Sequence, residues 1–142
     1  DKIRHGENVL KIIHPPAKII GKTKNLNETS IVATLTSRNT KTLFTGDIGT
    51  KTEKQISPLL ASTIDILKIP HHGSKYSSSE KLLKAAKAKI AVIEVGKNSY
   101  GHPTKETLKR LEHYNVRTFR TDEDGTVKIV SDGNTIKLFK FK

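Results

Sequence analysis

The chain of 142 residues contains no cysteine. It can therefore form neither disulfides nor thiolate metal sites, so any metal site must use histidine and carboxylate ligands. Long apolar runs are also missing, because no stretch approaches the roughly 18 residues that span a bilayer. No charged and then apolar leader with a small-residue cleavage site stands at the start. These residues thus exclude a disulfide scaffold and a membrane-spanning helix.

Acidic residues are scarce, with 14 Asp and Glu against 26 Lys and Arg, which gives a net charge of +12. The positive charge is spread over almost every segment and suits the binding of nucleic acid or another polyanion. Solubility or a lysine-rich codon usage explains the same charge, because lysines outnumber arginines and only arginine forms the bidentate phosphate fork. Composition alone leaves both explanations open.

Hydrophobic residues make up only 34% of the chain, but they fall in tight runs such as IVATL, TLFTG and IAVIEV, which disordered chains lack. Two capping boxes, Thr50-x-x-Glu53 and Ser77-x-x-Glu80, predict helix starts, and Pro58 is expected to shorten or kink the first helix. The predicted strands are residues 9–13, 30–37, 41–45, 65–69, 90–95, 116–120, 126–130 and 135–141, and the predicted helices are residues 50–62, 77–88 and 104–114. This order indicates one folded unit, an α/β or α+β layered sandwich.

Polar residues that can do chemistry follow three of the predicted strands: GDI at residues 46–48, HHGS at 71–74 and GHP at 101–103. In layered α/β folds ligands collect at the carboxyl ends of strands, so we expect the three segments to converge. Asp47 follows a strand and a glycine, which holds its carboxylate on rigid backbone where it could bridge two metal ions. The alternative is a turn or helix-cap aspartate, and a GD pair alone does not decide between them.

The adjacent His71 and His72 are more specific, because Pro70 ends a strand before them and Gly73 permits a close backbone approach. Neighbouring residues of an extended segment point to opposite sides, so we expect one histidine to meet a metal and the other to donate a proton or bind phosphate. His102 precedes a predicted helix and is an outer ligand, a general acid or a helix-start residue. Three further histidines are weaker candidates: His14, which could border the site, and His5 and His113, which should lie on the solvated surface.

Five segments, in order, resemble the C-terminal metallo-β-lactamase-like domain of ComEC-type competence DNA-uptake channel proteins: NETSIVATL, LFTGDI, DILKIPHHGSKYSSSEKLLKAAK, AVIEVGKNSYGHPTKETLKRL and FRTDEDGTVKI. The resemblance runs from about Val9 to Phe141, and its most specific part is LKIPHHGSKYSSSE followed by VGKNSYGHP. It implies an αββα sandwich holding two divalent metal ions, zinc or manganese, that activate a bridging water for attack on a phosphodiester. It also implies a bacterial cell-membrane protein with this domain outside the cytoplasm. The implied partners are DNA, the transmembrane channel portion of the same protein and other DNA-uptake machinery.

Carried over position by position, the resemblance implies that Asp47 is the metal-bridging carboxylate and that His72, with His71 beside it, is the late histidine ligand. It also matches His102 to the family's GHP loop near the site. We therefore expect Asp47 and His72 to bind metal and His71 and His102 to act in catalysis. The expected substrate-binding residues lie in the NETS and HHGSK segments: Asn27, Ser30, Ser74 and Lys75. The NETS segment matches a place where related enzymes often carry another ligand histidine. This chain has no histidine there.

The leading HxHxDH ligand motif of the fold is absent from the sequence. In the family it precedes the position of Val9, so residues 1–142 are expected to be the second half of one metallo-β-lactamase-like domain, its C-terminal portion only, with at most a partial metal site. The leading hypothesis is a nuclease-type hydrolase domain of a DNA-uptake protein, in which catalysis belongs to the longer protein. The alternatives are a free-standing phosphodiesterase of the same fold and a non-catalytic DNA-guiding module.

Overall fold

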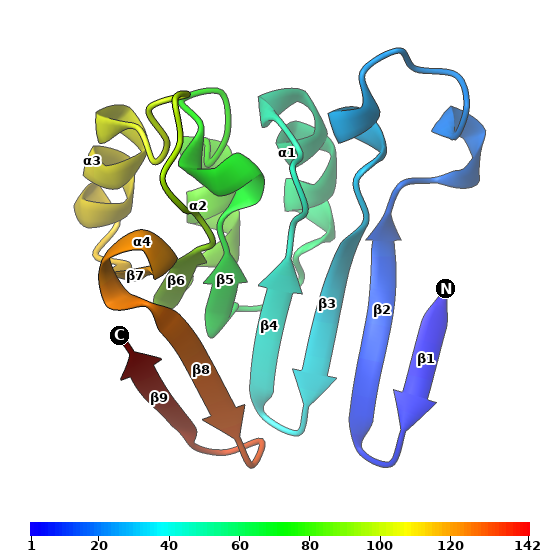
Figure 1. Cartoon of the computed structure of the whole chain (residues 1–142). Coiled ribbons are helices and arrows are strands. Elements are labelled where there is room, and N and C mark those ends of the chain that lie inside the picture. Colours follow the sequence, from blue (N-terminus) through cyan, green and yellow to red (C-terminus); the bar gives the residue numbers. More distant parts are fainter.

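The computed structural model describes residues 1–142 and is built on a seven-stranded sheet in the order β1-β2-β3-β4-β5-β6-β7 (Figure 1). Its strands are β1 (Lys2–His5), β2 (Asn8–His14), β3 (Val32–Ser37), β4 (Thr40–Phe44), β5 (Ile66–Lys68), β6 (Ile90–Ile93) and β7 (Arg117–Arg120). Strands β1 to β4 pair antiparallel, whereas β4 to β7 pair parallel. The sheet is therefore mixed, with an antiparallel half and a parallel half that share β4.

Three strand and helix repeats build the parallel half. The helices are α1 (Thr50–Ile56), α2 (Glu80–Ala86), α3 (Lys105–His113) and the single-turn α4 (Thr121–Asp124). Short 3-10 turns connect the elements: η1 (Ala17–Ile19), η2 (Leu26–Thr29), η3 (Ser57–Leu59) and η4 (Pro70–Gly73). None of the helices has the length and hydrophobicity needed to cross a membrane.

The core lies between the sheet and helices α1, α2 and α3, which sit behind the sheet in Figure 1. Side chains alternate along each strand, so one row across β4, β5 and β6, formed by Leu43, Leu67 and Ala91, points toward the helices and is fully buried. Apolar side chains of the helices complete this cluster: Ile56, Leu82, Leu83, Ala86 and Leu111. The burial of this face fixes the register of the parallel strands.

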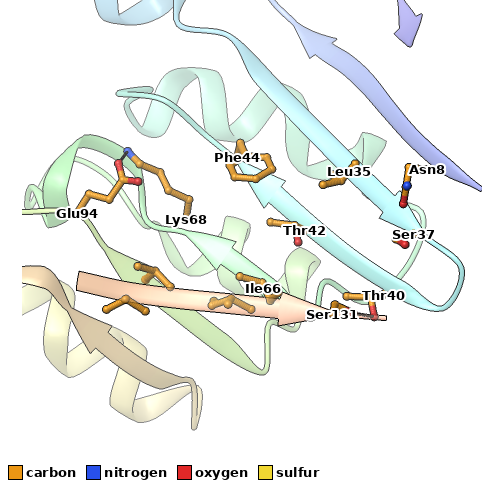
Figure 2. A pocket seen from close by; sticks show the side chains of 13 residues that line it. Asn8, Leu35, Ser37, Thr40, Thr42, Phe44, Ile66, Lys68, Glu94 and Ser131 are labelled. Atoms are coloured by element: carbon orange, nitrogen blue, oxygen red, sulfur yellow. Dashed lines mark hydrogen bonds and ion pairs between the residues drawn. The ribbon is translucent and has the colours of Figure 1, made fainter. Parts of the chain in front are cut away.

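The opposite face of the sheet is covered in part by an antiparallel hairpin of β8 (Thr126–Ser131) and β9 (Ile136–Phe141). A groove of about 410 Å³ remains between them, lined mainly by β3 to β6 and by β8 (Figure 2). Its apolar lining is Leu35, Phe44, Ile66, Val92, Val127 and Ile129. The hairpin tip is tied to the β3–β4 turn, where the Asn39 backbone N–H donates to the Gly133 carbonyl at 2.9 Å.

This arrangement confirms the predicted α/β fold class, and most predicted elements appear within a few residues of their expected bounds. The first helix ends at Ile56, just before Pro58, as the proline predicted. Sequence patterns did not indicate β1 or α4 as separate elements. The observed layers are three: helices, the large sheet and the small hairpin sheet.

Both predicted capping boxes are wrong. Gly49 is the N-cap of α1, and the Glu53 carboxylate accepts bonds from the backbone N–H groups of Ser78 and Ser79, at 2.5 and 2.8 Å, instead of closing its own helix. Ser79, not Ser77, caps α2 by accepting from the Leu82 N–H. The cause is the left-handed backbone of Ser78, which delays the start of the helix.

Candidate metal centre

The three polar segments that follow β4, β5 and β6 do converge at the carboxyl edge of the parallel half. Nε2 of His72 lies 3.7 Å from Oδ1 of Asp47, and the ring centroids of His71 and His102 are 5.7 Å apart. The His71 backbone N–H donates to the carbonyl of Gly46 at 3.3 Å, which joins the first two segments directly. The expected meeting of these strand ends is therefore found in the structure.

Asp47 is held in place by its neighbours rather than by its own side chain. Gly46 has φ +55°, and a Cβ added there would lie 2.8 Å from the Cβ of Ser30. The Asp47 backbone N–H donates to Oγ of Ser30 at 3.2 Å, and the Ser30 N–H in turn donates to the carbonyl of Asn27 at 3.2 Å. The predicted substrate residue Ser30 thus lies beside Asp47 and orients its backbone, whereas Asn27 reaches the site only through its bond to Ser30. The Asp47 carboxylate is left 39% exposed.

The prediction that His71 and His72 lie on an extended segment is wrong. Both adopt left-handed backbone, with φ +50° and +52°, inside η4. Such conformations cost of order 1–3 kcal/mol each in non-glycine residues and persist only where the surrounding structure enforces them. The two rings lie edge to face, 6.4 Å apart, so that His72 faces Asp47 while His71 faces His102.

Loop packing enforces this backbone. A Cβ on Gly73, which has φ +81°, would come within 2.6 Å of the Pro103 Cβ, so only glycine permits the close approach of the two loops. The Thr104 N–H donates to the Gly73 carbonyl at 3.0 Å, and Oγ1 of Thr107 donates to the carbonyl of Ser74 at 3.0 Å. The HHGS loop is consequently fastened to the start of α3.

His72 is oriented as a metal ligand would be. Its Nδ1 lies 2.6 Å from the Glu94 carbonyl, and a proton on Nδ1 donates to that oxygen. The Nε2 lone pair is then left facing Asp47, the arrangement in which a backbone carbonyl fixes the tautomer of a ligating imidazole. No group of three or more histidine, aspartate or glutamate side chains is arranged so that all of them could hold one metal ion. Asp47 and His72 therefore fit two ligand positions, one fewer than the three protein ligands of a catalytic zinc site.

Two charged residues at the site, Lys68 and Glu94, were not predicted from the sequence. Nζ of Lys68 lies 3.9 Å from Oδ1 of Asp47 and 3.7 Å from Oε2 of Glu94, and its side chain is only 14% exposed. Figure 2 shows Lys68 and Glu94 pointing toward one another at the edge of the groove. The available signal was a charged residue inside an apolar strand, in DILKIP and in IAVIEV. Lys68 places a positive charge beside the Asp47 carboxylate.

His102 extends the row of rings outward from His71. Partial burial lowers the pKa of the His102 imidazole, and charge on His71 and His72 would lower that pKa further by repulsion. The neutral ring is therefore favoured, and a neutral ring suits a proton acceptor better than a general acid. On its other side His102 stacks against Tyr100, with centroids 5.9 Å apart and an interplanar angle of 27°.

The remaining candidate residues differ in whether they are buried or exposed. Ser74 is buried and its Oγ accepts from the Tyr76 N–H at 3.3 Å, so its hydroxyl shapes the loop, whereas Lys75 is exposed. His14 is buried, and its Nε2 lies within 2.7 Å of the Glu28 carbonyl, which ties β2 to the following loop. His5 and His113 lie on the exposed surface, as expected.

Comparison with known proteins matches residues 3–97 of the chain to the Metallo-beta-lactamase superfamily. The chain is similar to ComE operon protein 3 of Bacillus subtilis, with 33% identity over 104 residues, and to Recombination protein 2 of Haemophilus influenzae, with 34% identity over 104 residues; each alignment covers 72% of the chain. It is also similar to Competence protein ComA of Neisseria gonorrhoeae, with 31% identity over 110 residues, or 74% of the chain. These alignments cover only 13%, 13% and 16% of the three relatives.

Proposed function

Because the chain belongs to the metallo-β-lactamase superfamily, as its resemblance to ComEC-type competence proteins predicted, we propose that it contributes to a metal-dependent hydrolase that cleaves DNA during uptake. One observation carries the proposal: the carboxylate of Asp47 and the oriented imidazole of His72 meet at 3.7 Å where three strand ends converge. The name of one relative, Competence protein ComA, supplies the setting.

Residues 1–142 form the second half of the catalytic domain in this proposal. Two ligands do not close a catalytic metal centre, so the other ligands, including the HxHxDH motif that the family resemblance implies, come from outside these residues. The half-covered sheet face supports the same division, because the groove beside β8 leaves Phe44 42% exposed. A second sheet packed on that face would complete an αββα sandwich.

The side chains at the site divide into distinct roles. Asp47 and His72 hold the metal, and their oxygen and nitrogen donors suit zinc or manganese. When bound, two such ions supply an activated water for attack on a phosphodiester. Lys68 pairs with a phosphate oxygen as well as with Asp47, since its ammonium already lies 3.9 Å from that carboxylate. His71 and His102 accept or relay a proton, and Lys75 contacts the backbone of the substrate.

DNA is the proposed substrate and partner because the chain carries a net charge of +12, its sequence resembles ComEC-type competence proteins, and one relative is named a competence protein. The proposal includes a longer polypeptide whose channel portion lies in the bacterial membrane, with this domain outside the cytoplasm and other uptake proteins nearby. In that setting the positive field steers DNA toward the strand-end site.

A non-catalytic DNA-guiding module is the second candidate. It is favoured by the absence of any group of three metal-ligating side chains in the chain and by the distributed positive charge. In that case Asp47 and Lys68 would form an ordinary ion pair at a turn. The two candidate functions differ in whether Asp47 and His72 are needed for DNA cleavage or only for the stability of the fold.

The test is metal-dependent cleavage of labelled DNA by the longer polypeptide that carries both halves of the domain. Asp47→Ala should lower cleavage with Mn²⁺ or Zn²⁺ by at least about 100-fold, because loss of even an outer-shell partner costs roughly 10- to 100-fold. DNA affinity should stay within about 2-fold, since it comes from distributed lysines. Glu112→Ala, at an exposed position on α3, is the matched control.

Unchanged cleavage by Asp47→Ala would remove the metal-centre proposal. Absence of cleavage by the wild-type polypeptide with every divalent metal tried, together with intact DNA binding, would favour the guiding module instead.

A further inference from the structure

Two exposed tyrosines stand beside the row of histidines that leads to Asp47. Tyr76 is 69% exposed and Tyr100 is 81% exposed, although the chain has only three tyrosines, four phenylalanines and no tryptophan. The third tyrosine, Tyr114, packs against the core and donates its hydroxyl proton to Glu80. A chain with so few aromatic side chains therefore places two of them in solvent at its candidate site, where they contribute little to folding.

Both tyrosines border one pocket of about 560 Å³. Its other lining side chains include His71 and His102, which belong to the candidate site, and the two lysines Lys75 and Lys105. Glu106 is the one carboxylate at its border. The pocket thus combines flat aromatic faces with two ammonium groups, and it adjoins the strand-end site through His71.

The backbone that carries these rings is held in place. The side-chain carbonyl of Asn98 accepts from the N–H groups of Tyr100 and His102, and its amide donates to the carbonyls of Gly96 and His102. The Tyr100 ring stacks on His102 and leaves its other face free. On the second loop, the carbonyl of Tyr76 accepts from the Thr50 N–H at 3.0 Å, and Nζ of Lys75 lies 5.0 Å from the Tyr76 ring.

We propose that Tyr76 and Tyr100, together with Lys75 and Lys105, form a stacking platform for the unpaired bases of single-stranded DNA. The inference rests on the proposed function and adds to it the form of the substrate. Every base has a π-face that can stack on tyrosine, so such a platform is indifferent to sequence, while ammonium groups hold the phosphates. Bases inside a duplex are already stacked on each other and cannot use it. The platform thereby favours one strand over two at the entrance to the metal centre.

Equilibrium binding to the 142-residue chain tests this inference. Anisotropy of a labelled 12-nucleotide oligothymidylate and of a 12-base-pair duplex is measured in EDTA, so that metal-dependent steps do not contribute. The double variant Tyr76→Ala/Tyr100→Ala should weaken single-strand binding by roughly 5-fold or more, from the usual contribution of base–aromatic stacking. Duplex affinity should stay within about 2-fold, because it depends on phosphate contacts.

Two matched variants separate stacking from general surface effects. Tyr76→Phe/Tyr100→Phe keeps the aromatic faces and should bind the single strand like the wild type. Phe139→Ala removes an exposed aromatic ring from the hairpin and should also leave binding unchanged. Because the chain has no tryptophan, its intrinsic fluorescence reports tyrosine. Oligothymidylate should quench the tyrosine emission of the wild type. In the double alanine variant most of this quenching should be absent.

Equal single-strand affinity of the wild type and the double alanine variant would overturn the platform, and so would an equal loss of single-strand and duplex affinity. These outcomes are independent of the cleavage test. Asp47→Ala should retain both the quenching and the single-strand preference. If this variant loses DNA cleavage but still prefers the single strand, both proposals are supported. Loss of cleavage in Asp47→Ala with no effect of the tyrosines would leave the hydrolase standing and remove the platform.

Discussion

The parallel and antiparallel halves of the same sheet differ in burial and in what their loops carry. In the parallel half, Leu67 and Ala91 are fully buried under the helices, whereas every residue of β1 at the antiparallel edge is exposed. Nearly all candidate site residues follow parallel strands, and the antiparallel half contributes chiefly Ser30, which orients Asp47. Dense packing on one side is what allows strained backbone, such as the left-handed His71 and His72, to persist at the site.

The largest difference between the halves should appear in core truncations. Leu67→Ala removes a fully buried side chain from β5 and should lower the free energy of unfolding by about 2–5 kcal/mol. Ile3→Ala, on the exposed edge strand β1, should change it by less than about 0.5 kcal/mol. Urea unfolding followed by circular dichroism measures both. Comparable losses would show that β1 belongs to the cooperative core.

A second contrast compares two glycines that have similar positive φ angles. Gly73 and Gly21 have φ +81° and +75°, but a Cβ on Gly73 would meet Pro103 at 2.6 Å, whereas one on Gly21 would meet nothing within 4 Å. Gly21→Ala should cost about 1 kcal/mol, from the left-handed backbone alone. Gly73→Ala should cost about 2–4 kcal/mol, because overpacking adds to that strain. Equal costs in thermal unfolding would mean that the HHGS and GHP loops do not constrain each other.

A buried carboxylate inside the parallel half should show a smaller but pH-dependent effect. Glu53 is fully buried and accepts from two backbone N–H groups at the start of α2, so Glu53→Gln, which replaces one acceptor oxygen by a donor, should cost about 1–3 kcal/mol. The exposed Glu112→Gln should be neutral. Urea unfolding at pH 7 compares the two variants.

Burial raises the pKa of Glu53 above its ordinary value of 4.5, although the bonds from Ser78 and Ser79 act in the opposite direction. The folded chain then holds this proton more tightly than the unfolded chain. The unfolding free energy of the wild type relative to Glu53→Gln should accordingly rise as the pH falls through the raised pKa, and level off below about 4.5. A relative stability that falls over this window would contradict the assignment.

The smallest effect should come from the tip of the β8–β9 hairpin, which is tied to the β3–β4 turn. The Asp132 carboxylate accepts from the N–H groups of Asn134 and Thr135, which lower its pKa from 3.8 to about 2. Its stabilising contribution is complete above pH 3.8 and is lost as the pH falls through about 2. An NMR titration of the carboxyl carbon measures the pKa directly. A midpoint near 3.8 would show that the turn is open in solution.

The parallel half was also the more predictable half. Apolar runs ending in GD, HHGS and GHP indicated both the strands and the convergence of their loops, since parallel strands bring their carboxyl ends to one edge. Edge strand β1 has little apolar patterning, because it buries nothing, and its sequence therefore carried little signal.

Other features depended on tertiary contacts that no local pattern encodes. Glu53, three residues after Thr50, is typical of a capping box, yet its carboxylate accepts from the backbone at the start of α2. The left-handed histidines follow from the contact between Gly73 and Pro103, which are far apart in the sequence. Lys68 was concealed within an apolar strand, where its ammonium reaches Asp47 only because β4 and β5 are neighbours.

The most direct test of the central claim, that Asp47 and His72 are two ligands of a metal centre, is a zinc titration of the chain followed by proton–nitrogen NMR of the imidazoles. Nε2 of His72 should shift at zinc concentrations at least about 10-fold lower than those that affect the exposed His5 and His113, because a second donor adds to its affinity. In Asp47→Ala that advantage should disappear. A His72 resonance that responds no earlier than His5 and His113, or that responds equally in Asp47→Ala, would contradict the account.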